Sequence, residues 1–226
     1  LSAEILTDEA VMAPVSGQRQ LDRKNLRRAS QLMDEAGWRV NADGMREKDG
    51  QVFTLEVLDS SPAFDRITNP MIENMKALGI DARLNRVDTA QESERTRAYD
   101  FDVTTHSMRM GFEPSSGLEQ YFGTKAMDQS SRNLMGLSDP AVDALIEKVV
   151  RAQSKAELNT NIRALDRVLR AKRFWIPQWF KAVHTVAYYD QYGHPDPLPP
   201  FARGELDFWW FDADKAAKLK SAGVLN

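Results

Sequence analysis

The chain has 226 residues, of which 42% are hydrophobic and 28% charged, the balance of a globular protein with room for a sizeable core. Its formal net charge of -3 argues against a nucleic-acid partner, because phosphate binding requires an excess of clustered Lys and Arg. Cysteine is absent, which excludes disulfides and thiolate metal sites, and no run of 18 apolar residues predicts a membrane span.

The first predicted elements are a lead-in, a helix and a hairpin. Residues 1–20 show no strong periodicity and are expected to form an extended lead-in. They lack the basic and apolar regions of a signal peptide. Because the chain begins without Met, we expect it to be a segment of a longer polypeptide, although processing or trimming would give the same start. Asp22 is expected to cap a helix that Gly37 ends. The Asp-Gly pairs at 43–44 and 49–50 predict a hairpin.

An alternation of strands and helices follows. Residues 53–57 and 80–84 alternate apolar and polar side chains, as half-buried strands do, and residues 101–105 indicate a buried strand. Helical spacing predicts helices over residues 67–78, where Pro70 marks a kink or a restart, and over residues 89–98. This order predicts an α/β fold with a mostly parallel sheet and crossover helices.

Two further helices carry clear start signals. Asp139 is expected to cap a helix with Pro140 at its first position, and Ser154 with Glu157 forms a capping box for a second helix. We expect these two helices to cover the sheet. Residues 175–189 are rich in aromatic and β-branched types, which suggests strands, and Asp212 begins a last short helix.

Patterns for catalysis, metal binding and phosphate binding are missing from the sequence. The sequence contains three histidines, His106, His184 and His194. It has no Gly-x-Ser-x-Gly motif, which a serine hydrolase would carry, and no His-Glu-x-x-His motif or close histidine pair, which a zinc site would need. The glycines are scattered and form no phosphate loop. We therefore expect no catalytic residue, no metal and no cofactor.

The loop over residues 105–122 is the predicted ligand site, because it follows a strand at the carboxyl edge of an open α/β sheet. Its candidate contacts mix hydrogen-bonding, charged and flexible apolar side chains, namely His106, Ser107, Met108, Arg109, Phe112 and Glu113. Arg109 can fork onto a carboxylate and Glu113 can hold an ammonium group, but the two can equally pair with each other. A loop folded on its own side chains is the alternative.

Seven short motifs occur in the order found in one known family. They are residues 32–38 (LMDEAGW), 43–46 (DGMR), 78–81 (LGID), 101–103 (FDV), 131–136 (SRNLMG), 139–146 (DPAVDALI) and 176–179 (IPQW). On these motifs the chain resembles the C-terminal part of an extracellular solute-binding protein of family 5, the oligopeptide-binding type that serves ABC importers. The IPQW segment and the Trp-rich ending resemble the Yej branch, which is associated with oligopeptides and microcin C.

The resemblance implies the second lobe of a class II periplasmic-binding-protein-like fold, with a mixed, mostly parallel sheet and flanking helices. Residues 1–20 are then the lead-in, residues 21–180 the ligand-binding lobe, and residues 181–226 a return segment toward a missing N-terminal lobe. Ligands of such proteins lie between two lobes that close on them. The implied partners are that lobe, a peptide-like solute and a membrane permease, and the implied location is the periplasm without membrane insertion.

The expected function is reception of an oligopeptide or peptide-like solute, without catalysis. Asn133 and Trp179 join the loop residues as predicted ligand contacts. The acidic anchor that family members use for the peptide amine has no equivalent at Met110 or Gly111, which argues against the usual recognition of a free amino terminus. The alternatives are a sugar or opine receptor, a hydrolase that uses the same cleft, and a docking module.

Overall fold

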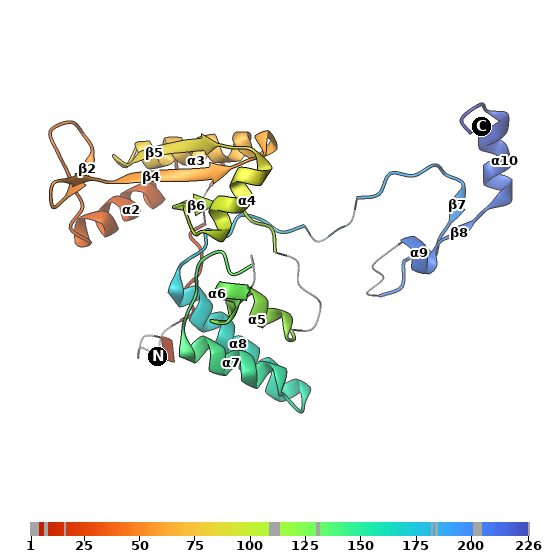
Figure 1. Ribbon diagram of the computed structural model, residues 1–226. Coiled ribbons are helices and arrows are strands. Elements are labelled where there is room, and N and C mark those ends of the chain that lie inside the picture. Colours follow the sequence, from red (N-terminus) through yellow and green to blue (C-terminus); the bar gives the residue numbers. More distant parts are fainter. Residues whose placement is uncertain are drawn as a thin grey trace. The chain divides into compact units, whose positions relative to one another are not determined.

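The computed structural model describes residues 5–6, 9–15, 17–108, 114–129, 132–181, 183, 185–200 and 205–225. The chain divides into two compact units, Leu1–Pro177 and Gln178–Asn226, and we describe each by itself (Figure 1). Among the described residues, none of the helices combines the length and the apolarity that a membrane span requires.

The first unit begins with the predicted helix and a small antiparallel sheet. Helix α2 (Arg23–Glu35) is capped by Asp22, whose side chain accepts a hydrogen bond from the Asn25 amide at 2.9 Å. Gly37 follows the helix at φ +89°, in the left-handed region that suits glycine. The predicted hairpin is confirmed, with strand β2 (Arg46–Lys48) pairing both with β1 (Arg39–Val40) and with β3 (Gln51–Val52).

A buried arginine joins the helix to this sheet. Arg46 is 3% exposed, and its guanidinium donates to Asp34 at 2.6 Å and to the carbonyl oxygens of Trp38 and Leu78 at 2.9 and 3.0 Å. A buried charge needs partners of this kind, because burial without them costs several kcal/mol. Arg46 therefore links α2, β2 and the turn that follows α3.

The main sheet is parallel, as predicted. Strand β4 (Thr54–Asp59) lies between β5 (Asp81–Arg86) and β6 (Val103–Thr104), with helices α3 (Asp65–Lys76) and α4 (Thr89–Arg97) as the crossovers. A short 3-10 helix, Pro62–Phe64, precedes α3, and α3 continues through Pro70. Helix α3 lies along the sheet (Figure 1). The core between them contains Val57, Ile72, Ile80 and Ala82.

Strand β6 is shorter and less buried than the sequence predicts. It has two residues, both half-buried, where a buried strand over residues 101–105 was expected. The side chain of Asp102 explains the early boundary, because its Oδ2 accepts from the amide of Glu56 on β4 at 2.8 Å. In a longer β6 the amide of Glu56 would donate to a main-chain carbonyl oxygen, but here it donates to the Asp102 side chain.

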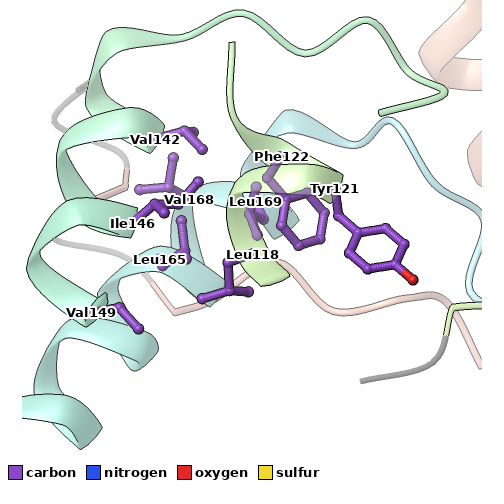
Figure 2. Packing of buried hydrophobic residues seen from close by; sticks show 9 residues of the cluster. All are labelled: Leu118, Tyr121, Phe122, Val142, Ile146, Val149, Leu165, Val168 and Leu169. Carbon is purple, nitrogen blue, oxygen red and sulfur yellow. The ribbon is translucent and has the colours of Figure 1, made fainter. Parts of the chain in front are cut away.

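Four further helices follow in the first unit, and three of them form a second core. The four are α5 (Gly117–Phe122), α6 (Ala126–Gln129), α7 (Pro140–Val150) and α8 (Lys155–Lys172). Helices α7 and α8 run side by side (Figure 1) and bury their apolar faces against each other and against α5 (Figure 2). The expectation that they cover the sheet is wrong, since the described helix side chains in the apolar core of the sheet come from α2 and α3.

The start signals of α7 and α8 are confirmed. Asp139 accepts from the amides of Ala141 and Val142 at 2.8 and 3.3 Å. Ser154 accepts from the amide of Glu157 at 3.1 Å, but the Glu157 carboxylate accepts from Gln153, one residue before the cap. The capping box is therefore displaced by one position, and it still provides partners for two main-chain amides.

The second unit pairs two short strands and ends in a helix. Strand β7 (Tyr192–Gly193) is antiparallel to β8 (Trp210–Phe211), which follows α9 (Glu205–Phe208). Asp212 caps α10 (Ala213–Ser221), as predicted. The ring of Trp209 lies against those of Tyr188 and His194, with centroids 4.4 and 5.0 Å away.

The strands suggested for residues 175–189 are not formed in the described part of that range. A strand requires a partner for its main-chain groups, and the described residues supply none there. The apolar side chains of this segment remain open to solvent, with Trp179 61% and Phe180 87% exposed. β-Propensity without a partner strand therefore leaves an irregular chain.

Candidate functional site

The carboxyl edge of the parallel sheet is the candidate site. Strand β4 ends there at Asp59, β5 ends at Arg86 and β6 ends at Thr104, so the residues that follow all three strands meet at one edge. Open α/β sheets bind small molecules at this edge, because strand ends and loops there leave polar groups around a crevice.

A buried ion network fixes two of these strand ends. Asp59 is 3% exposed, and its Oδ1 accepts from the Ser61 amide at 2.7 Å and lies 3.2 Å from Nη1 of Arg86. Arg86 also pairs with Asp65 at the start of α3. Because a buried carboxylate is costly without its cation, this network holds β4, β5 and α3 together at the edge.

The predicted loop residues follow the third strand. His106 and Ser107 begin two residues after the end of β6 and are exposed, whereas Met108 is half-buried and packs against the helical core. Arg109, Phe112 and Glu113 lie outside the described residues. Trp179 belongs to the second unit.

Asn133 is also a predicted ligand contact. Its side chain is 0% exposed, with Nδ2 donating to the carbonyl oxygens of Gly123 and Leu137 at 3.1 and 2.9 Å. Its Oδ1 accepts from the Leu137 amide at 2.9 Å. Both ends of the amide are therefore engaged with the main chain, which gives Asn133 a structural role, and its ligand contact stays a prediction.

Tyr99, which precedes β6, also binds the loop that contains Asn133. Its hydroxyl lies 3.0 Å from the carbonyl oxygen of Asn133 and 3.2 Å from that of Met127, and burial raises the pKa of the hydroxyl. The residue has φ +55°, an uncommon conformation for a side chain of this size. It lies two residues after α4, so it joins the connection between α4 and β6 to the loop that contains Asn133.

Arg132 is the residue that the sequence reasoning missed. Its guanidinium carbon lies 5.6 Å from the centroid of the Tyr121 ring, and its Nη1 donates to Oε1 of Gln120 at 2.6 Å. Tyr121 lies at one end of the helical core cluster with its hydroxyl directed away from the other side chains (Figure 2). In the sequence, the only signal for Arg132 was its position inside the 131–136 motif, next to Asn133.

Arg132 also acts on the first predicted loop residue. The pKa of His106 is lowered, chiefly by partial removal from water and further by the positive charge of Arg132. The structure thus places Arg132, from the loop before α7, over the Tyr121 ring of α5, and the positive charge of Arg132 acts on His106, which lies two residues after β6. These groups can supply hydrogen bonds, an aromatic face and positive charge to a ligand.

One depression of the first unit is lined by described residues that include none of the predicted contacts. A depression of about 470 Å³, open to solvent, lies between residues 17–20 and α3 and is lined in part by Ile67, Pro70, Met71 and Asn74. Within the ranges that the structure describes, no three acidic or histidine side chains gather as a metal site would need.

Comparison with known proteins shows which family the chain matches. The family model of the bacterial extracellular solute-binding proteins, family 5 Middle, matches residues 7–129. The chain is 40% identical over 213 residues to the uncharacterized protein y4wM of Sinorhizobium fredii, which covers 93% of this chain and 32% of that protein. It is 38% identical over 209 residues to the probable peptide-binding protein YejA of Agrobacterium fabrum, covering 92% and 34%.

A solved structure shows the same fold. The oligopeptide-binding protein AppA of Bacillus subtilis, in complex with a nonapeptide, superposes with a TM-score of 0.59 at 18% identity, over 74% of this chain and 35% of that one. The fold of the described residues is therefore the α/β fold of these binding proteins. The chain spans about a third of the length of the curated relatives it matches.

Proposed function

The chain belongs to the bacterial extracellular solute-binding proteins of family 5, and from this membership we propose that the complete protein is the substrate-binding component of an ABC importer. Its ligand is an oligopeptide or a peptide-like solute. The observation that carries this proposal is the match to a probable peptide-binding protein, 38% identical, over 92% of the chain.

In this proposal the chain supplies the C-terminal part of a two-lobed receptor in the periplasm. Residues 1–20 lead in, residues 21–180 form the second lobe, and residues 181–226 return toward an N-terminal lobe. The exposed aromatic side chains support this division, because Trp179, Phe180, Trp210 and Phe211 are 54–87% exposed in the part described here. Exposed apolar groups of this size commonly mark an interface.

The ligand lies at the carboxyl edge of the main sheet and is enclosed when the two lobes close. His106 and Ser107 offer hydrogen bonds from their exposed positions after β6, and Met108 offers an adaptable apolar contact. We assign charge recognition to Arg109 and Glu113 and apolar walls to Phe112 and Trp179. The solute leaves for the permease chemically unchanged.

The test is to identify what the complete protein carries. Purification from its native periplasm, followed by extraction and mass spectrometry, is expected to yield peptides or peptide-like molecules. Recovery of a sugar or an opine would overturn the peptide assignment, and turnover of a model peptide or ester would overturn the receptor assignment.

Calorimetry then tests the site. Arg109→Ala in the complete protein is expected to weaken binding of the recovered ligand if that ligand bears a carboxylate. Arg151→Ala is the matched control, because Arg151 is an exposed residue after α7 whose ion pair with Glu147 lies within the helical region. Equal affinities for the two variants would remove Arg109 from the site.

A further inference from the structure

Basic side chains gather at helix α2 and the turn before it. Residues 19–28 contain five basic residues and one acidic residue, which gives this stretch a net charge of +4 in a chain whose total is -3. All five basic residues are exposed, namely Arg19, Arg23, Lys24, Arg27 and Arg28. Because charges in water act over only about 10 Å at 0.1 M salt, a partner that touches α2 meets positive charge although the whole chain is acidic.

The carboxylates of α2 leave most of this charge uncompensated. Asp22 serves as the cap of the helix. Asp34 lies 2.6 Å from Nη1 of the buried Arg46, and Glu35 pairs with Arg28 at 3.2 Å. Within the described part of the chain, the ion pairs of α2 do not include the three other basic side chains of the helix, namely Arg23, Lys24 and Arg27.

Apolar side chains accompany the basic ones. Lys24, Arg28 and Leu32 are spaced by four residues, so they lie on one side of the helix, whereas Met33 packs against the core of the main sheet. Leu32 is 45% exposed, and Leu21, just before the helix, is 47% exposed. Two exposed leucines therefore bracket the basic residues in the sequence.

A bilayer with anionic headgroups fits this combination. Each Lys or Arg near such a surface strengthens binding about fivefold. Long basic side chains place their charge among the headgroups, while an exposed leucine can enter the boundary of the acyl chains. An acidic protein segment would use the charges alone, whereas a bilayer uses the charges and the leucines and adapts to the convex surface of a helix.

We propose that the exposed face of α2 is an attachment surface for an anionic phospholipid bilayer. The cations Arg23, Lys24 and Arg27 supply the attraction, and Leu21 and Leu32 supply apolar contact. The attachment is peripheral, so α2 stays packed on the sheet. It goes beyond solute binding and does not depend on which solute is bound. In the proposed receptor, it brings the loaded protein to the surface that contains the permease.

Sedimentation with vesicles tests the proposal. The 226-residue chain is mixed with vesicles of phosphatidylcholine, alone or with phosphatidylglycerol. The neutral vesicles give the baseline, because the exposed aromatic side chains of the second unit can bind both kinds. At low salt the chain is expected to bind the anionic vesicles about tenfold or more tightly than the neutral ones. This excess is expected to vanish at about 1 M salt, where charges are screened within about 3 Å.

Two triple variants remove the same charge from different helices. Changing the three unpaired basic residues of α2 to Gln is expected to lower binding to that of neutral vesicles, because each contributes about fivefold. The matched control, which is expected to keep the binding, changes three exposed basic residues of α7 and α8 to Gln, namely Lys148, Lys155 and Arg163. Glutamine suits a helix, and circular dichroism checks the folding. If the α2 variant does not fold, Arg27→Gln decides, with an expected loss of about fivefold.

A pair of apolar variants tests the leucines. Leu32→Ser is expected to weaken binding to anionic vesicles, whereas Val150→Ser, at a position of similar exposure at the end of α7, keeps it. Equal effects of these two changes would remove the apolar contact and overturn the bilayer as the partner.

Other outcomes also decide. Equal binding to neutral and anionic vesicles overturns the proposal, and so does an equal loss in the two triple variants. Displacement from the vesicles by hexaglutamate at the same total charge would assign the face to an acidic protein segment and overturn the bilayer as the partner. Binding that the complete protein lacks would show that another part of the protein covers α2, which overturns the proposal without touching the receptor assignment.

Discussion

An Asn133→Ala variant removes three hydrogen bonds from the fully buried side chain that supports the loop before α7. The side chain donates to the carbonyl oxygens of Gly123 and Leu137 and accepts from the Leu137 amide, at 3.1, 2.9 and 2.9 Å. Alanine leaves two carbonyl oxygens and one amide without these partners, in a position that is 0% exposed.

The expected loss of stability follows from this count. A hydrogen bond contributes about 1 kcal/mol net, so three contribute about 3 kcal/mol. Water entering the polar space left by the amide group restores part of this, whereas a buried group that stays unpaired costs more. We therefore expect the free energy of unfolding to fall by about 2–4 kcal/mol.

Urea unfolding monitored by circular dichroism measures the change. The slope of the unfolding free energy against urea concentration should be the same for Asn133→Ala and the unaltered chain, which shows that both unfold in a comparable way. Asn161→Ala is the matched control, because it makes the same substitution where the side chain donates a single exposed hydrogen bond, at 3.0 Å, to the Lys148 carbonyl. Its expected change is within about 0.5 kcal/mol, since alanine also favours the helix.

A loss below about 1 kcal/mol for Asn133→Ala, or one equal to that of the control, would refute the reasoning. It would mean that the loop does not depend on the Asn133 amide, and that the residue is available for the ligand contact first predicted for it.

Three further predictions concern the two cores and the edge. Arg86→Met leaves the carboxylate of Asp59 buried without its cation, so urea unfolding is expected to show a loss of about 3–5 kcal/mol, partly restored by adding Asp59→Asn. Leu165→Ala, at a position 0% exposed in the helical core (Figure 2), is expected to cost about 2–5 kcal/mol in the same assay. The pKa of His106 is lowered from 6.5, so the unfolded chain binds this proton more readily than the folded chain. The stabilisation from neutral His106 is therefore fully present above pH 6.5 and is lost as the pH falls from 6.5 through the lowered pKa. Urea unfolding measured at several pH values in this range should show a smaller decline of the unfolding free energy for His106→Gln.

Much of the fold was predictable because its signals are local. Asp22, Asp139 and Asp212 each bond to amides two or three residues away, so the starts of α2, α7 and α10 follow from short stretches of sequence. The alternation in residues 53–57 and 80–84 and the helix between them also predicted the parallel pairing of β4 and β5.

Predictions failed where the outcome depended on distant partners. Residues 175–189 have the composition of strands, but a strand forms only where another strand accepts its hydrogen bonds, and the described residues provide none there. The apolar stripes of α7 and α8 predicted that each helix buries one face. That they bury it against α5, and not against the sheet, was decided by tertiary packing.

The candidate site shows the same division. Sequence alone determined that a polar loop follows β6 at the carboxyl edge and that His106 and Ser107 lie at its start. Tertiary structure decided the roles of two adjacent residues, Arg132 and Asn133. The amide of Asn133 is buried because Gly123 and Leu137 bind it, and Arg132 lies over the Tyr121 ring because that ring and Gln120 hold it there. These are contacts between separate segments, and no local pattern encodes them.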